Sequence, residues 1–150
     1  MKITELLIAE HTLFCSVFDH IELTLPDLKT LGEARLMGRL VETLLRAHAK
    51  TEEELAYTAL DHVLHEKGQL DRLHLDHHEI DAHLKQVQNA KKVGEARHLL
   101  QEALAATRAH FHHEERTVFP LIEKVLQGET LVKLGEVWMQ QRAVPASQAV

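Results

Sequence analysis

Histidine is the commonest metal ligand in proteins and also an acid–base group near neutral pH, and this chain of 150 residues has 13 histidines. They are distributed along the chain and do not form a terminal run. Two of them begin the same pattern, His-x-x-x-Glu-Glu, which pairs His48 with Glu52 and His110 with Glu114. Residues four apart lie one above the other on a helix, so each pair predicts two ligands that reach one cavity.

These pairs belong to a weak internal repeat. The segment that begins at His48 matches the segment that begins at His110, and an acidic residue precedes both His11 and His77. His11 and His77 also lie on the apolar stripes of their own segments, so all four motifs are expected to face one interior. Buried polar groups cost free energy unless they have partners, and metal ions would serve all of them together. The repeat therefore predicts two helical hairpins around a site for two metal ions.

The elements that position these residues are predicted to be helices, because nearly every segment has helical periodicity and the chain has few prolines and glycines. Five helices are expected, at about 3–24, 30–64, 69–91, 95–127 and, as a short amphipathic piece capped by Thr130, 131–139. Thr30 and Glu33 form a capping box, Gly68 marks a break, and Pro120 should kink the fourth helix.

Helices joined by short connections pack against antiparallel neighbours. We therefore predict an all-α fold, an up-down-up-down four-helix bundle over residues 1–140, followed by a flexible tail at 141–150. A length of 150 residues, 45% of them hydrophobic, suits one domain with a continuous core.

The composition argues against several classes of partner. A formal charge of −6 without a concentrated basic patch argues against nucleic acid. No segment approaches the roughly 20 apolar residues that cross a bilayer, and the first ten residues lack the pattern of a secretory signal. Cys15 is the single cysteine, so an internal disulfide is excluded. We expect a soluble, cytoplasmic protein without nucleic-acid or membrane partners.

The order of the motifs resembles the hemerythrin and HHE-domain family over about residues 5–125. The motifs are His11, His48-x-x-x-Glu52, the histidines of 74–78, and His110-x-x-x-Glu114-Glu115 followed by Val118-Phe-Pro120. The resemblance implies two non-haem iron ions inside a four-helix bundle, bridged by an oxo or hydroxo oxygen and by the carboxylates of Glu52 and Glu114. It also implies that His11 and His48 serve one iron, and His110 and the third-helix histidines the other.

The histidines of the third helix leave alternatives open. Oxygen-carrying hemerythrins have a His-x-x-x-His pair there, and His74 with His78 has that spacing. The apolar stripe and the match to His11 instead select His77. We predict His77 as a ligand, with His74 as a fifth histidine because residues i and i+3 share a helix face, and His78 as a flanking residue.

The identity of the last carboxylate ligand is also open, because Glu115 follows His110 at the spacing found in the oxygen-carrying hemerythrins. Helical geometry favours Glu114, since residue i+5 turns about 140° away unless the helix is locally bulged. The predicted ligands are therefore His11, His48, Glu52, His74, His77, His110 and Glu114. The histidines predicted to lie at the surface are His20, His62, His65, His83, His98, His112 and His113.

The mixture of imidazoles and bridging carboxylates suits iron better than structural zinc, and magnesium or calcium would prefer mostly oxygen ligands. Two carboxylates carry less negative charge than the four of ferritin-like oxidases, which favours reversible chemistry. We expect reversible binding of O2, with Phe14, Leu44 and Phe111 as apolar neighbours and no catalytic acid or base. The alternatives are a redox or stress-response protein that acts on nitric oxide or peroxide, a role in iron–sulfur repair, and an iron or oxygen sensor.

Overall fold

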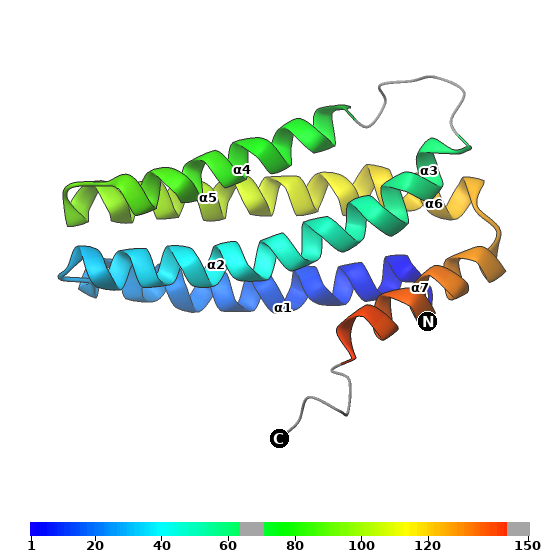
Figure 1. Ribbon diagram of the computed structural model, residues 1–150, viewed down its shortest axis with the longest axis horizontal. Coiled ribbons are helices and arrows are strands. Elements are labelled where there is room, and N and C mark those ends of the chain that lie inside the picture. The colour runs from blue at the N-terminus through cyan, green and yellow to red at the C-terminus, as the bar shows by residue number, and fades with distance from the viewer. Residues whose placement is uncertain (64–70, 144–150) are drawn as a thin grey trace.

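Four long helices lie side by side and alternate in direction (Figure 1). The structure, a computed structural model, describes residues 1–63 and 71–143. The long helices of the bundle are α1 (Ile3–Thr24), α2 (Leu31–Thr51), α4 (Asp71–Asn89) and α5 (Val93–His113), and α7 (Gly128–Arg142) follows them at the C-terminal end. The predicted all-α, antiparallel four-helix bundle with a fifth C-terminal helix is confirmed.

The start of α2 shows how local signals set the helix register. A 3₁₀ turn, η1 (Leu25–Asp27), follows the last residue of α1, and Thr30 is the N-cap of α2. Thr30 Oγ1 accepts a hydrogen bond from the backbone N of Glu33 at 3.2 Å, and the Glu33 carboxylate accepts one from the backbone N of Thr30 at 2.8 Å. The predicted capping box is therefore present.

Two π-helical turns interrupt the helices that carry the His-x-x-x-Glu motifs. They are η2 (Glu52–Tyr57), which α3 (Thr58–Asp61) continues, and η3 (Glu114–Val118), which α6 (Phe119–Val125) continues. Each π turn begins at the glutamate of its motif, and such turns often mark functional sites. Pro120 comes directly after η3, in the first turn of α6, so the departure from α-helical geometry precedes the proline.

The apolar core consists of two clusters. One cluster includes Phe14 on α1 and Phe111 on α5. The other includes Leu7, Tyr57 and Phe119 and lies at the opposite end of the bundle. Along α1, α2 with η2, and α4 the motif histidines fall between residues of the two clusters, and on α5 Phe111 of the first cluster follows His110 directly. The core therefore holds the polar side chains from both sides.

The helix α7 differs from its prediction. It begins at Gly128 with Gln127 as its N-cap, so the expected cap at Thr130 is wrong, and it continues through Arg142, beyond the predicted boundary at residue 140. It packs against α1, with Leu131 and Gly135 buried. The predicted break at Gly68 and the tail from residue 144 lie outside the described residues. Within residues 1–63 and 71–143, no helix has the length and apolar character needed to cross a bilayer.

Candidate metal centre

Six of the seven predicted ligands come together inside the bundle. Their ligand atoms form two groups, and within each group all of them lie within 4.8 Å of one another: His11, His48, Glu52 and Glu114 in the first, and Glu52, His77, His110 and Glu114 in the second. Both glutamates belong to both groups. This is the arrangement of a site for two adjacent metal ions that share carboxylate ligands.

Each long helix of the bundle supplies one histidine, and each π turn supplies one glutamate. The i,i+4 spacing predicted from the sequence operates within both motifs. His48 Nε2 lies 3.6 Å from Glu52 Oε2, and His110 Nε2 lies 3.2 Å from Glu114 Oε1. The shared carboxylates therefore reach the interior from the same helix faces as their histidines.

The donor set fits bound metal ions. Both oxygens of Glu52 and Oε2 of Glu114 are buried, and none of the three has a hydrogen-bond partner among the described residues. The Nε2 atoms also face one another in pairs, 3.1 Å apart for His11 and His48 and 2.8 Å apart for His77 and His110. Buried carboxylates without partners are costly, and a cation among them would remove that cost.

Every one of these imidazoles has a carboxylate at its other nitrogen. Nδ1 lies 2.9 Å from Glu115 in His11, 2.9 Å from Glu10 in His48, 2.8 Å from Glu53 in His77 and 3.4 Å from Asp76 in His110. Because a carboxylate accepts hydrogen bonds, Nδ1 carries a proton and donates a hydrogen bond to it. This leaves the lone pair of Nε2 free for a metal. The rings are therefore held in the orientation that a metal requires.

These four supporting carboxylates were not predicted, although the sequence carries their signal. An acidic residue precedes His11 and His77, and a second glutamate follows Glu52 and Glu114, in both halves of the repeat. Glu114 is fully buried in the centre, whereas Glu115, the alternative bridge, pairs with His11 instead.

Burial changes the ionisation of these groups. It lowers the pKa of His11 to about 3 and also lowers the pKa of His77, so both imidazoles are neutral at pH 7. Burial and the nearby charge of Glu114 raise the pKa of Glu52. Burial also opposes the charged form of Glu114, but the contact with His110 outweighs it and lowers the pKa of Glu114 to about 2.

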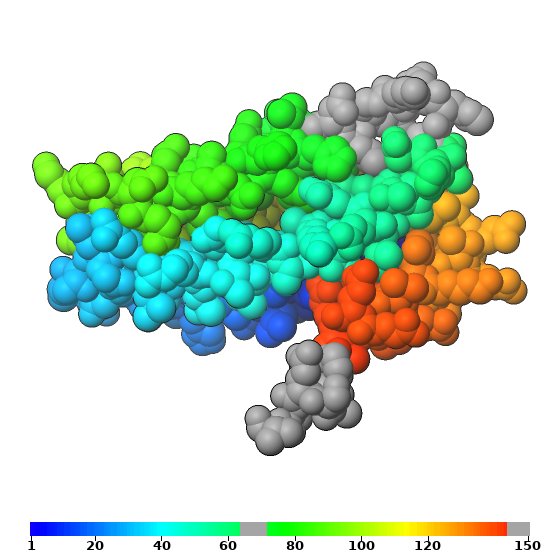
Figure 2. Space-filling view, viewed as in Figure 1, coloured from blue at the N-terminus to red at the C-terminus, as the bar shows by residue number. Residues whose placement is uncertain are grey.

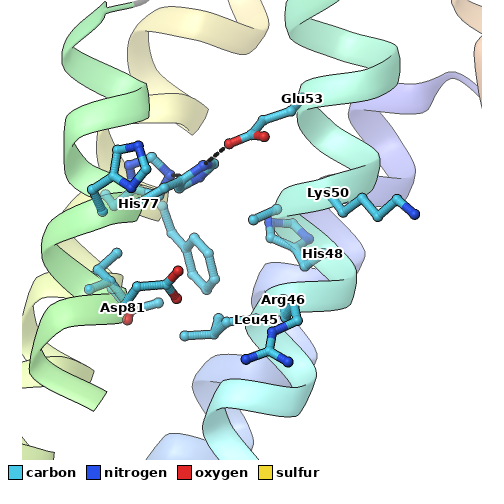
Figure 3. Close-up of a pocket in the computed structure, with 13 residues that line it drawn as sticks. Leu45, Arg46, His48, Lys50, Glu53, His77 and Asp81 are labelled. Atoms are coloured by element: carbon cyan, nitrogen blue, oxygen red, sulfur yellow. Dashed lines mark hydrogen bonds and ion pairs between the residues drawn. The ribbon is translucent and has the colours of Figure 1, made fainter. Parts of the chain in front are cut away.

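A pocket of about 260 Å³ reaches the centre between α2 and α4 (Figure 3). His48 and His77 face this pocket from opposite walls, and His77 is joined there to Glu53. Apolar side chains, among them Leu45 and Phe111, are part of its lining. A small ligand can therefore approach the histidines from this face.

The structure does not bring His74 into either group of ligand atoms. Its side chain is 45% exposed, against 13% for His77, and its Nδ1 lies 3.6 Å from Glu53 Oε1. His78 is exposed as well. Among the described residues, four histidines, not five, meet at the centre. Of the predicted surface histidines, His83 is half-buried, His65 lies outside the described residues, and the exposed ones are His20, His62, His98, His112 and His113.

Tyr57, nine residues after His48 as Phe119 is nine after His110, is a further residue of the site, and no role was predicted for it. Its buried hydroxyl donates a hydrogen bond to the Glu114 carboxylate, and its ring stacks on His77 with centroids 6.0 Å apart. Phe119, its counterpart in the repeat, stacks on His11 at 5.5 Å and has no hydroxyl. The two halves of the centre therefore differ here.

Replacing Tyr57 should affect the metal-free protein most. We expect Tyr57→Phe to lower its free energy of unfolding by about 1.5–3 kcal/mol, because the charged Glu114 loses a hydrogen bond. The loss should be smaller after metal loading, since bound metal would take up the charge of Glu114. Urea unfolding of both forms measures the difference.

Thr4→Val is the matched control, because Thr4 Oγ1 donates to Glu123 at 2.6 Å and neither residue belongs to the ligand groups. Its effect should be the same with and without metal. An equal effect of Tyr57→Phe in both forms would contradict a ligand role for Glu114.

The fold and the site together define a class: an antiparallel four-helix bundle with a buried His/Glu centre suited to two metal ions. The family model of the hemerythrin HHE cation binding domain matches residues 2–122, and the chain belongs to that family. No curated protein and no solved structure gives a significant match.

Proposed function

We propose that the chain is a non-haem di-iron protein whose reduced centre binds O2 reversibly. The observation that carries this proposal is the pair of ligand groups that share Glu52 and Glu114. Mixed imidazole and carboxylate ligands with bridging favour iron. When bound, two ferrous ions would supply two electrons and positions at which O2 can bind.

The side chains divide the work of holding and shielding the centre. His11 and His48 would hold one ion, and His77 and His110 the other, with both glutamates between them. Phe111 stacks on His11 with ring centroids 3.8 Å apart and an interplanar angle of 9°, so it excludes water on that side. Of the other predicted apolar neighbours, Phe14 contacts the ring of His48, whereas Leu44 is only partly buried against the core.

A second candidate, a redox enzyme that acts on peroxide, is favoured by the number of histidines. Because His74 is outside both groups, each ion would receive two histidines, and positions for other ligands remain at both ions. The pocket of about 260 Å³ also admits ligands larger than O2 and lets water approach. Disproportionation of hydrogen peroxide to water and O2 needs no further reactant.

Anaerobic loading with ferrous iron, followed by exposure to air, tests the proposal. For a reversible carrier we expect a visible absorption band that appears under air and disappears under vacuum through repeated cycles. Rapid oxidation that vacuum does not reverse would overturn reversible binding. Release of O2 from added hydrogen peroxide, measured with an oxygen electrode, would then support the second candidate.

A further inference from the structure

Arg142, the last residue of α7, reaches across to the two helices of the first hairpin. Its Nε and Nη2 donate to the two carboxylate oxygens of Glu10 on α1, at 2.9 and 3.2 Å. Its Nη1 donates to Thr51 Oγ1 at 2.8 Å, and its Nη2 also donates to the carbonyl of Ala47 at 3.4 Å, both on α2. A two-pronged contact of this kind fixes both the position and the orientation of a carboxylate.

The carboxylate that Arg142 holds is the one that supports His48. Glu10 Oε2 lies 2.9 Å from His48 Nδ1, and His48 is one of the four histidines of the centre. The side chain of Glu10 is only 15% exposed, so water competes little for these bonds. Trp138, also on α7, lies under the guanidinium with the Arg142 carbon 4.4 Å from its ring centre. A single carboxylate thus joins α7 to a metal-facing imidazole.

Within residues 1–63 and 71–143, the second half of the repeat shows no such link between Asp76 and another helix. Asp76 occupies the place of Glu10 and accepts from Arg72 Nε at 2.8 Å. Arg72 comes from the same helix, four residues earlier, and its side chain is 70% exposed. Exposed pairs of this kind contribute little. The carboxylate that supports His48 is therefore held from a different helix, α7, whereas the carboxylate that supports His110 is held by an arginine of its own helix.

The position of α7 against the bundle is closely constrained. α7 lies beside the last turns of α2 and η2 in the space-filling view (Figure 2), and it also packs along α1. A Cβ atom added at Gly135 would collide with the carbonyl oxygen of Met1, so the two backbones are in direct contact there. A side chain at residue 135 should therefore displace α7 without touching the centre.

We propose that Arg142 is a positioning residue that, through Glu10, orients His48 for metal binding, so that the docking of α7 is coupled to metal occupancy. The inference rests on the metal site of the proposed function, but not on iron or O2. Coupling is reciprocal: the factor by which docked α7 strengthens metal binding is the factor by which metal strengthens docking.

Titration of the full metal-free chain with Co²⁺, followed by its visible absorption, tests the first half of the coupling. Arg142→Gln should weaken one of the two bound ions by about 10–100-fold, the usual cost of losing a group that orients a ligand, and leave the other unchanged. Arg142→Lys should weaken it less, because an ammonium keeps the charge but not the two-pronged contact. Arg72→Gln is the matched control and should change neither ion by more than a few-fold.

Hydrogen exchange tests the other half of the coupling, the effect of bound metal on the docking of α7. Co²⁺ should slow amide exchange across α7 in the original chain and leave it unchanged in Arg142→Gln, a difference that a merely structural arginine would not produce. Gly135→Val should speed exchange in α7 and weaken the same ion as Arg142→Gln.

The inference would be overturned if Arg142→Gln bound both ions with native affinity, or if metal left the rate of amide exchange in α7 unchanged in the original chain. Either result would leave the proposed function intact. An original chain that binds two Co²⁺ ions but no O2 when loaded with iron would overturn only the proposed function. A chain that binds no metal would overturn both.

Discussion

Removal of His48 or of His110 should each abolish the binding of one metal ion. We expect His48→Ala to lose the ion held with His11, and His110→Ala the ion held with His77, because the two ligand groups share only their glutamates. Each variant should fall from about two irons per chain to about one or fewer, since metal affinity depends on the full number of ligands. Iron content after anaerobic loading and desalting, together with a Co²⁺ titration, measures the loss.

Two neighbouring histidines serve as controls. His113→Ala removes an exposed imidazole one turn from His110, and His74→Ala removes the predicted fifth ligand that lies outside both groups. Both variants should keep the iron content of the original chain. If His48→Ala and His110→Ala also keep it, the assignment of the centre is wrong, and iron loss in His74→Ala would restore the five-histidine arrangement.

Replacing Glu52, a fully buried carboxylate, should make the metal-free protein more stable while it destroys the site. Glu52 is fully buried, neither of its oxygens has a hydrogen-bond partner among the described residues, and burial raises its pKa. Glu52→Gln removes this charge and keeps the shape of the side chain. We expect the free energy of unfolding of the metal-free protein to rise by about 1–3 kcal/mol, the scale of a relieved buried charge.

The same substitution removes a ligand from both groups, so metal should no longer stabilise the protein. Urea unfolding with and without Co²⁺ measures both effects. Glu54→Gln, on the same π turn but half exposed, is the control and should stay within about 0.5 kcal/mol of the original chain. A metal-free Glu52→Gln protein that is less stable than the original would show that Glu52 is satisfied without a metal.

Much of the fold followed from local patterns. The periodic apolar positions and the Thr30 cap predicted the long helices, because both signals act within one or two helical turns. The start of α7 was predicted too late in the sequence. Gln127 makes no side-chain capping hydrogen bond, whereas Thr130 is a residue type that often caps helices, so the helix was expected to begin after Thr130. The π turns at Glu52 and Glu114 were also missed, since a π turn adds one residue without changing the composition of a segment.

The sequence by itself determined that the histidine and the glutamate of each repeated pair share one helix face. The spacing of His48 with Glu52, and its repetition at His110 with Glu114, follows from about 3.6 residues per turn and needs no knowledge of neighbouring helices. The family resemblance drawn from these motifs is confirmed over residues 2–122.

Contacts between helices were decided only by the tertiary structure. Whether His74 or only His77 reaches the centre depends on how far α4 is rotated against η2, and a rotation of a few tens of degrees separates a buried imidazole from an exposed one. The same packing decides which carboxylate lies at the Nδ1 atom of each histidine. It also brings Arg142, near the far end of the chain, to Glu10. Spacing along one helix is set by its own backbone geometry, whereas these contacts are set by how separate helices cross.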